Sequence, residues 1–511
     1  MATTAEYLNA LIRDKKEYIN KISNLLEEPV DENLTFSELN EIYYRALCKQ
    51  TMDQIGNTLL RYFSSNGANS LENFKNISEE QRQVLNVRFT SGNLSYLGSS
   101  LNMLQSAEGL EQFNSQYLSN LSHLFYQCYN LNNIDALSTW NTSNVKDIDY
   151  LFYYTNLNNI EAIKNWNTNK IENMSSFLSS AGVKNLYPLL NWNVNNVKNI
   201  QYAFSGIGNN THPLDLYPLS KWNTQNFINI RSIFSSGYPT NIDALTNWKI
   251  NNVIDMAYAF SSNNITNLSF ITNWNTGKVI NMYKALPSSN LLTNIQPLAN
   301  WNISNVTDMT GLFAGTGITN LNALKNWKMN NVTEIGGLFS GCKNLTDVSA
   351  IQNWNTGKIN CMWNLFLGCT NLKTVNISGW NLDSSKYTPD FTGCTNLITV
   401  DVTGLNVKNI YSGYQMFANC PNLITVVGLE TWNLSNWGDA QQMFRYCNNL
   451  SNSTIEGIAK MLLTGTKMSN TYKNLHYWNS YGPGYNSTLG NKINNLFPDL
   501  ANDLKNNGWV F

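Results

Sequence analysis

The sequence predicts an α/β repeat solenoid with helical caps at both ends, and two observations lead to this fold class. The first is a tryptophan that recurs about every 26 residues along most of the 511-residue chain. It stands at Trp140, Trp166, Trp192, Trp222, Trp248, Trp274, Trp301, Trp327, Trp354, Trp380 and Trp432. The second is an apolar pattern that repeats with the same period. Because one such turn cannot bury its own apolar edge, about 12–13 turns are expected to stack into one core between residues 86 and 450.

The first half of each period has apolar residues at spacings of three and four. In the turn that begins at Trp140, Val145 is followed by Ile148 and then by Phe152, and most other turns repeat this order. Such spacing places the three side chains on one face of a helix. A short helical segment or tight turn is therefore expected in each period.

The second half of each period favours a short strand. The segments TVNIS (374–378) and TVDVTG (399–404) alternate in polarity and are rich in β-branched residues, which suit a pleated strand. The period between Trp192 and Trp222 is longer than the others, and the extra residues are expected to form a protruding loop at 206–215.

The repeat unit resembles that of a known family. The segments WNISNVTDMTGLFAGTGITNLNALKNW (301–327) and WNTGKINCMWNLFLGCTNLKTVNISGW (354–380) are similar to the BspA-like leucine-rich surface repeat. The resemblance covers roughly residues 89–450 and matches many positions at once. It implies a leucine-rich-repeat-like array, and a role like that of the family's bacterial surface proteins, which adhere to host matrix and to other cells.

The N-terminal region, residues 1–85, lacks the tryptophan period. Its first segment is an amphipathic helix, a capping box from Thr35 to Glu38 begins a second, and a third is expected near Ser78. This opening loosely resembles a short module of phage tail and baseplate-associated proteins. The region is expected either to attach the protein to other virion or surface-assembly proteins or to cap the first turn.

The C-terminal region, residues 451–511, also lacks the period. Two helices are expected on either side of a loop rich in tyrosine and glycine at 476–490. The expected role is a cap on the last turn, because a solenoid needs a polar end to remain soluble.

Composition and motifs exclude several functional classes. A formal net charge of −1 gives no electrostatic basis for binding nucleic acid. The N-terminus does not have the pattern of a secretory signal. No stretch approaches 18 consecutive apolar residues, so membrane insertion is not expected. The sequence has no zinc-ligand spacing, P-loop, GxSxG or HExxH motif. The protein is therefore predicted to be no enzyme and to need no metal or cofactor.

Several recurring side chains are interpreted as structural. The tryptophans are expected to form a core spine, and the asparagine that follows most of them is expected to satisfy loop backbone groups in an internal ladder. The carboxylates before the repeat's Ile or Met, such as Asp255, are expected to face solvent. Six cysteines follow the phenylalanine position by three residues and are expected to be packed free thiols: Cys128, Cys342, Cys369, Cys394, Cys420 and Cys447.

The predicted function is recognition. The main hypothesis is a phage virion component, at the tail, baseplate or another exposed site, whose solenoid contacts a host surface protein or glycan. One alternative is a bacterial cell-surface adhesin, and another is a glycan-cleaving tailspike. Homo-oligomer formation is compatible with each. Ligand contacts are expected in the two loops, at His212, Asp215, Tyr477, Trp478, Tyr481 and Tyr485.

Overall fold

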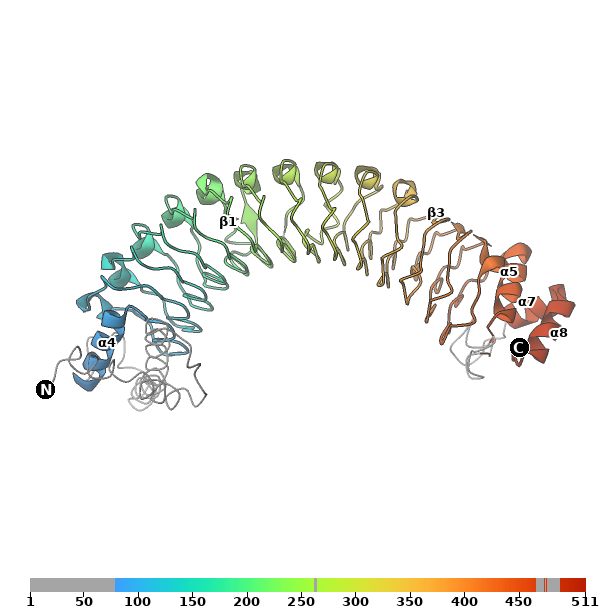
Figure 1. Ribbon diagram of the computed structural model, residues 1–511, viewed down its shortest axis with the longest axis horizontal. Coiled ribbons are helices and arrows are strands. Elements are labelled where there is room, and N and C mark those ends of the chain that lie inside the picture. Colours follow the sequence, from blue (N-terminus) through green and yellow to red (C-terminus); the bar gives the residue numbers. More distant parts are fainter. Residues whose placement is uncertain (1–78, 262–263, 466–472, 474, 476–487) are drawn as a thin grey trace, which may run out of the picture. The chain divides into compact units, whose positions relative to one another are not determined.

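The computed structural model describes residues 79–261, 264–465, 473, 475 and 488–511. The chain divides into two compact units. Unit 1 contains residues 1–157 and 161–166, and unit 2 contains residues 158–160 and 167–511. In each unit the turns of the repeat lie side by side (Figure 1). The predicted repeat solenoid is therefore confirmed, but its turns contain less regular structure than an α/β array would.

The half-period before each tryptophan is a short 3-10 helix in most turns. These helices are η2 (Leu110–Gln112), η3 (Asp135–Thr139), η4 (Glu161–Ile163), η5 (Tyr187–Leu189), η6 (Tyr217–Lys221), η7 (Ile242–Leu245), η8 (Ser269–Ile271), η9 (Gln296–Leu298), η10 (Asn322–Leu324), η11 (Ser349–Ile351) and η12 (Leu429–Thr431). An Asn or Asp side chain often accepts the N–H at the start, as Asp347 Oδ1 does from Ser349 at 2.8 Å. That bond favours a turn over a strand.

Regular strands are few and short. Unit 2 contains β1 (Leu214–Asp215), β2 (Pro239–Thr240), β3 (Thr374–Asn376), β4 (Thr399–Asp401) and β5 (Thr425–Val427). Strands β3, β4 and β5 form a parallel sheet. The strand prediction is confirmed for the segments at 374 and 399, where the side chains are β-branched, and is wrong for most other turns.

Of the short helical segment or tight turn expected after each tryptophan, the described turns contain tight turns. In the turn of Trp166, the N–H groups of Met174, Ser176, Leu178 and Ser180 donate to carbonyls of the next turn over 2.7–3.0 Å. The N–H groups of Phe177 and Ser179 donate to carbonyls three positions earlier, and that of Ser175 donates to Asn173 Oδ1. Ser176 and Ser180 have φ of 52° and 53°, which turns alternate peptide groups along the solenoid. A helix would use all these N–H groups inside one turn, whereas this string of tight turns joins neighbouring turns.

The tryptophans form the predicted core spine. Those of the eleven turns are only 1–6% exposed. Several indoles also donate to a carbonyl of an earlier turn, as Trp301 Nε1 does to Ile271 O at 3.3 Å. Beside them the phenylalanines from Phe313 to Phe444 stack in sequence, with ring centroids 5.2–5.7 Å apart.

The six cysteines are buried free thiols, as predicted. Each Sγ donates to a backbone carbonyl of the preceding turn, as Cys342 does to Phe313 O at 3.0 Å. Burial raises the pKa of Cys342 to about 11. The position therefore selects a small side chain that can both fill space and donate a hydrogen bond.

The asparagine ladder differs from the prediction. Asparagines directly after tryptophan, such as Asn302, are exposed, and Asn302 Oδ1 accepts the N–H of Ser304 at 3.0 Å. These asparagines therefore do satisfy backbone N–H groups, but they do so within one turn and at the surface. The ladder between turns is made by asparagines four residues after tryptophan, since Asn305 Nδ2 donates to Gly277 O at 2.6 Å.

In the described part of the chain, the α-helices outside the periodic turns are α4 (Glu79–Ser91), α5 (Asn452–Leu463), α7 (Thr488–Leu496) and α8 (Pro498–Asn506). Helix α5 packs on β5 and η12, and α7 and α8 pack on α5. The Thr454 hydroxyl accepts the N–H of Val426 at 3.1 Å and donates to Ile424 O at 3.2 Å. A side chain of α5 thus bonds backbone groups of the last turn. Of the N-terminal region predicted at 1–85, residues 1–78 lie outside the described residues.

Candidate functional site

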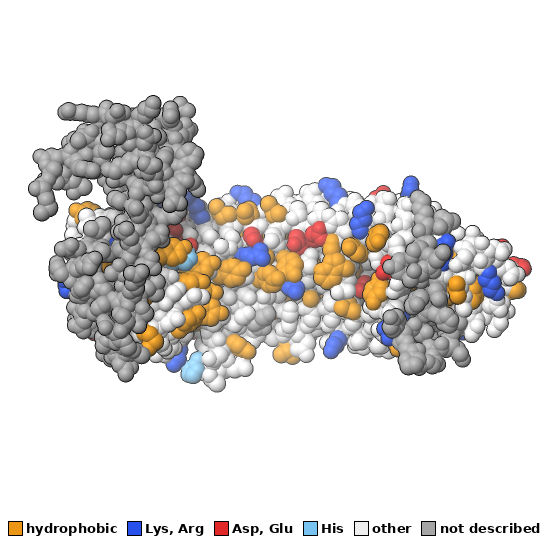
Figure 2. All heavy atoms as spheres, turned by 90° about the horizontal axis from the view of Figure 1, so that it is seen from below, with side chains coloured by type: hydrophobic (Ala, Val, Ile, Leu, Met, Phe, Trp, Pro, Cys, Tyr) orange, Lys and Arg blue, Asp and Glu red, His pale blue; other side chains and the backbone are white. Residues whose placement is uncertain are grey.

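The ninth and tenth residues after each tryptophan are the surface positions with the most varied chemistry. In the turn of Trp192 the flanking Ile200, Ala203 and Phe204 are buried, whereas Gln201 and Tyr202 are half-exposed. The tenth residue often has positive φ, as Tyr202 does at 57°. On the side away from the 3-10 helices, rows of hydrophobic side chains cover the described turns, with single basic and acidic side chains between them (Figure 2).

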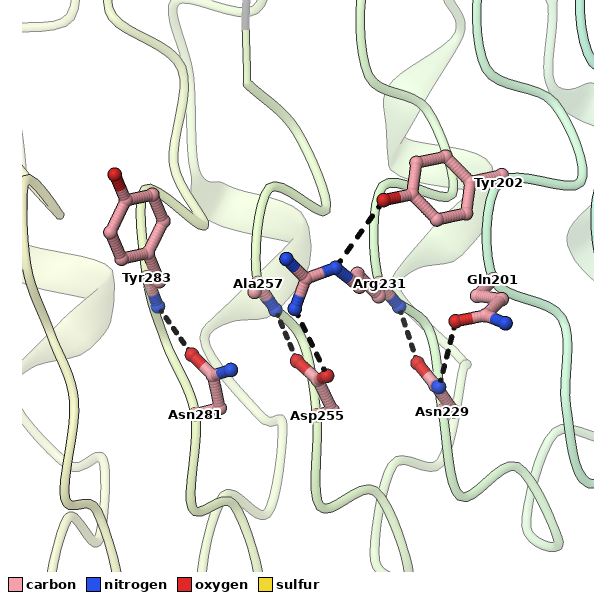
Figure 3. Close-up of polar contacts among 8 residues, drawn as sticks. All are labelled: Gln201, Tyr202, Asn229, Arg231, Asp255, Ala257, Asn281 and Tyr283. Carbon is pink, nitrogen blue, oxygen red and sulfur yellow. Dashed lines mark hydrogen bonds and ion pairs between the residues drawn. The ribbon is translucent and has the colours of Figure 1, made fainter.

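The recurring carboxylate or amide at the seventh position has a structural role. Asp255 Oδ1 accepts the N–H of Ala257 at 2.9 Å, and Asn281 Oδ1 accepts that of Tyr283 at 3.0 Å (Figure 3). Asp308 makes the same bond to Thr310 at 2.8 Å. These side chains are half-buried rather than solvent-facing, because they cap the start of the string of tight turns.

One basic side chain lies at the centre of a polar and aromatic group in unit 2, which we call the arginine cluster: Tyr202, Arg231, Asp255, Tyr258 and Tyr283. Arg231 Nε donates to Tyr202 Oη at 3.4 Å, and its guanidinium lies 3.4 Å from Asp255 Oδ2 (Figure 3). Its Cζ lies 5.5 Å from the ring centroid of Tyr258, which is 4.9 Å from that of Tyr283. The cluster spans four consecutive turns.

The electrostatics of the arginine cluster favour a fixed cation. The hydrogen bond to Tyr202 and the charge of Asp255 raise the pKa of Arg231, against the opposing effect of burial. A guanidinium carries five N–H groups, and its hydrogen bonds to Tyr202 and Asp255 leave further donors for a ligand. The arrangement can therefore present the Arg231 guanidinium to a ligand as a charged hydrogen-bond donor that is fixed in position among aromatic rings.

Unit 1 has a different aromatic group at equivalent positions. The imidazole of His123 stacks between Tyr96 and Tyr150, with centroid distances of 4.3 and 4.6 Å. Tyr126 and Tyr153 stack beside them at 5.1 Å. Because neighbouring rings cover one another's faces, this group presents mainly ring edges and hydroxyl groups.

The predicted contacts in the insertion are only partly available. Residues 209–213 are exposed, and the His212 ring lies 3.0 Å from the hydroxyl of Thr211. Asp215 Oδ1 accepts from Tyr217 N at 2.8 Å and Asn241 Nδ2 at 2.9 Å, so this carboxylate is largely engaged in local structure. No hydrogen bond in the described part of the chain joins His212 to Asp215. The predicted contacts Tyr477, Trp478, Tyr481 and Tyr485 lie outside the described residues.

The surface positions were missed because they follow no fixed residue type. Aligning the turns on tryptophan would have placed Tyr150, Tyr202 and Tyr258 at one position, which is the signal that the sequence offered. Among the described residues, no group of His, Cys, Asp and Glu side chains could hold a metal ion. The described helices include none with the length and apolar character needed to cross a membrane.

A family model described as "Mycoplasma protein of unknown function, DUF285" matches five overlapping stretches, 93–217, 156–269, 209–322, 236–348 and 336–458. Together they cover residues 93–458, which is 366 of 511 residues. The chain belongs to this family. No curated protein matches it.

Some solved structures are similar in part. A leucine-rich-repeat protein of T. pallidum is 16% identical, over 32% of this chain and 79% of that one, with a TM-score of 0.19. A leucine-rich cell surface protein of Faecalibacterium prausnitzii is 14% identical, over 65% and 82%, with a TM-score of 0.28. The functional domain of InlJ from Listeria monocytogenes is 14% identical, over 58% and 50%, with a TM-score of 0.17.

Proposed function

We propose that this DUF285-family protein is a non-enzymatic binding module of the cell surface that adheres to a protein or glycan of another cell. The observation that carries the proposal is the row of half-exposed or exposed tyrosine, arginine, lysine and tryptophan side chains at the ninth and tenth positions. Core positions keep one chemistry from turn to turn, whereas these positions vary. A surface that varies on a constant scaffold is typical of recognition by solenoids.

The arginine cluster is the best candidate for contact with a protein. Arginine and tyrosine dominate the binding energy of many protein interfaces, especially when they are held in place before binding. In the same turns three isoleucines at the sixth position, Ile228, Ile254 and Ile280, are 37%, 41% and 45% exposed. Exposed apolar side chains in successive turns, close in sequence to a held cation, have the composition of an interface centre.

A bacterial surface location is preferred to a virion location. The family match covers the turns, and one of the similar structures is a cell surface protein, which is the kind of protein that the alternative hypothesis names. The phage hypothesis depends on residues 1–78, to which the family match does not extend. Attachment through that segment stays a prediction.

The non-enzymatic part of the proposal is supported by the state of the carboxylates. Glycan cleavage needs two carboxyl groups that are free to act on the substrate. In the described turns, Asp147, Asp255 and Asp308 each have an oxygen that accepts a backbone N–H. Incubation with host polysaccharides should therefore release no reducing ends, and their appearance would contradict this part of the proposal.

Adhesion is tested by binding of the purified full-length protein to intact host cells and to immobilised matrix proteins. Arg231→Ala should lower the affinity about tenfold or more, because alanine removes a held donor from the interface centre. Lys325→Ala is the matched control, since Lys325 is an exposed cation on another part of the turn. Absence of binding by the intact protein to any of these surfaces would refute the proposed function.

A further inference from the structure

One turn of unit 2 is shorter than the rest, and its backbone does not meet the preceding turn in the usual way. Trp380 and Leu405 are 25 residues apart. At most of the described junctions between complete turns, four N–H groups of one turn donate to carbonyls of the next. Between the turns of Trp354 and Trp380, the described backbone bonds of this kind are from Phe366 to Asp390 at 2.9 Å and from Gly368 to Thr392 at 2.8 Å.

The short turn places a carboxyl group where other turns have an apolar side chain. The N–H of Phe366 meets Asp390 O as the N–H of Phe339 meets Leu365 O, so Asp390 occupies the position of a buried leucine. Its Oδ1 accepts the N–H of Thr392 at 2.7 Å. Burial raises the pKa of the Asp390 carboxyl. A hydrogen bond from the backbone of Asn364 partly offsets this effect of burial.

A hollow of about 270 Å³ opens beside this carboxyl, with aromatic side chains from three consecutive turns around it: Trp363, Tyr387 and Tyr414. They are 45%, 45% and 46% exposed. The indole of Trp363 lies against Gly336, where an added Cβ would come within 2.9 Å of Cε2. A glycine of the preceding turn therefore lets the indole lie close to the backbone. No ring contact joins these three aromatics, unlike the stacked rings of unit 1.

The polar side chains of the hollow are mostly neutral. Asn364 and Gln415 contribute amide groups, and Asp390 contributes the carboxyl group. Gln415 Nε2 donates to Gln442 Oε1 at 2.6 Å, and this bond fixes the Gln415 amide. The Gln415 amide oxygen can then accept a hydrogen bond from a ligand. Amide and carboxyl groups in a rigid position can accept and donate hydrogen bonds to hydroxyl groups.

We propose that the hollow bounded by Trp363, Tyr387, Tyr414 and Asp390 binds a neutral pyranose residue of a cell-surface glycan. The aromatic walls suit the C–H surface of a sugar ring, and the amides and carboxyl suit its hydroxyl groups. The inference rests on the proposed function and names a ligand class for one part of the same surface.

A sugar fits these groups better than an ammonium ion does. Aromatic rings with a carboxylate can also bind quaternary ammonium. The Asp390 carboxyl, however, already accepts backbone N–H groups, and burial disfavours its negative charge. Hydroxyl groups do not require that charge.

A second hollow adjoins the first and gives room for a longer glycan. It has a volume of about 430 Å³, and Tyr387 lines both hollows. Tyr411, Asn409 and Asn436 line its other sides. An oligosaccharide can therefore continue from one hollow to the other past Tyr387.

The test uses the full-length protein and an array of immobilised neutral, sialylated and sulfated oligosaccharides, with phosphocholine-coated wells beside it. Neutral glycans should bind. Trp363→Ala and Tyr414→Ala should each weaken that binding tenfold or more, and Trp363→Phe should keep it within about threefold, because a ring face remains. Tyr217→Ala is the control, since Tyr217 is 49% exposed but lies outside the hollow. Melting temperatures are measured for every variant.

The outcomes separate this inference from the adhesion proposal. Binding to phosphocholine but not to neutral glycans would overturn the ligand class. Glycan binding that folded Trp363→Ala and Tyr414→Ala leave unchanged would overturn the site. If the protein adheres to host cells and binds no glycan on the array, the adhesion proposal stands and this inference fails. If the intact protein neither adheres to host cells nor binds a glycan on the array, both the adhesion proposal and this inference are refuted.

Discussion

Replacing Trp301 by alanine removes one member of the tryptophan spine. Trp301 is 4% exposed, and Trp→Ala changes in cores cost about 3–5 kcal/mol through lost burial and the cavity left behind. The change also removes the hydrogen bond from the indole to Ile271 O, which still accepts the N–H of Trp274, and the loss of one buried hydrogen bond costs about 1 kcal/mol more. We therefore expect a loss of about 4–6 kcal/mol in the free energy of unfolding.

Trp274 gives a matched comparison in the preceding turn. It is also 4% exposed, but its Nε1 has no hydrogen-bond partner. Trp274→Ala should therefore cost about 3–5 kcal/mol, which is less than Trp301→Ala by the value of one hydrogen bond.

The assay is urea unfolding followed by circular dichroism and by tryptophan fluorescence, because the two probes reveal whether unfolding remains cooperative along the solenoid. Host-cell binding is measured on the same samples. If Trp301→Ala keeps the unfolding midpoint of the unaltered protein and loses only its ligand, the spine is a binding surface and the reasoning is refuted.

Three further predictions follow from particular bonds. The buried ladder cysteines should resist alkylation at pH 8 and react on unfolding, because burial raises their pKa, to about 11 at Cys342; reaction of the native protein at the unfolded rate would contradict this. Asn305→Ala should lower the free energy of unfolding by about 0.5–1 kcal/mol in urea titrations, since it removes the bond to Gly277 O, whereas Asn302→Ala breaks no bond between turns. A carboxyl whose folded pKa is raised stabilises the fold at low pH and loses that contribution as pH rises through the folded pKa. Asp390→Asn should therefore stabilise the protein at pH 7, with a benefit that disappears below about pH 4, and a benefit that grows on acidification would show that the pKa is not raised.

The period of the repeat could be predicted well because it depends on burial. One tryptophan, one phenylalanine and often one cysteine occur at fixed distances, and stacking converts each fixed distance into a column of side chains. The strands at 374 and 399 could also be predicted, since their β-branched residues act locally.

The sequence left a short helix and a tight turn as alternatives because apolar spacing alone does not distinguish the two. In both, residues three and four apart can share a buried side. The difference lies in residues of positive φ that stand four apart, such as Ser176 and Ser180, whose side chains give no strong local preference for that conformation. Hydrogen bonds to the next turn hold them there, and those partners lie about 26 residues away in the sequence.

For the candidate sites too, some features could be predicted from the sequence and others could not. By itself, the sequence determined that the chain stacks, which residues form its core, and that the turn after Trp380 is one residue short. Only the tertiary structure decided that this shortening puts Asp390 in an apolar position, where it lines one hollow with Trp363 and Tyr414. The reason is that core burial repeats with the period of one turn, whereas a surface site is assembled from single side chains of several turns, and no local pattern records which of them meet.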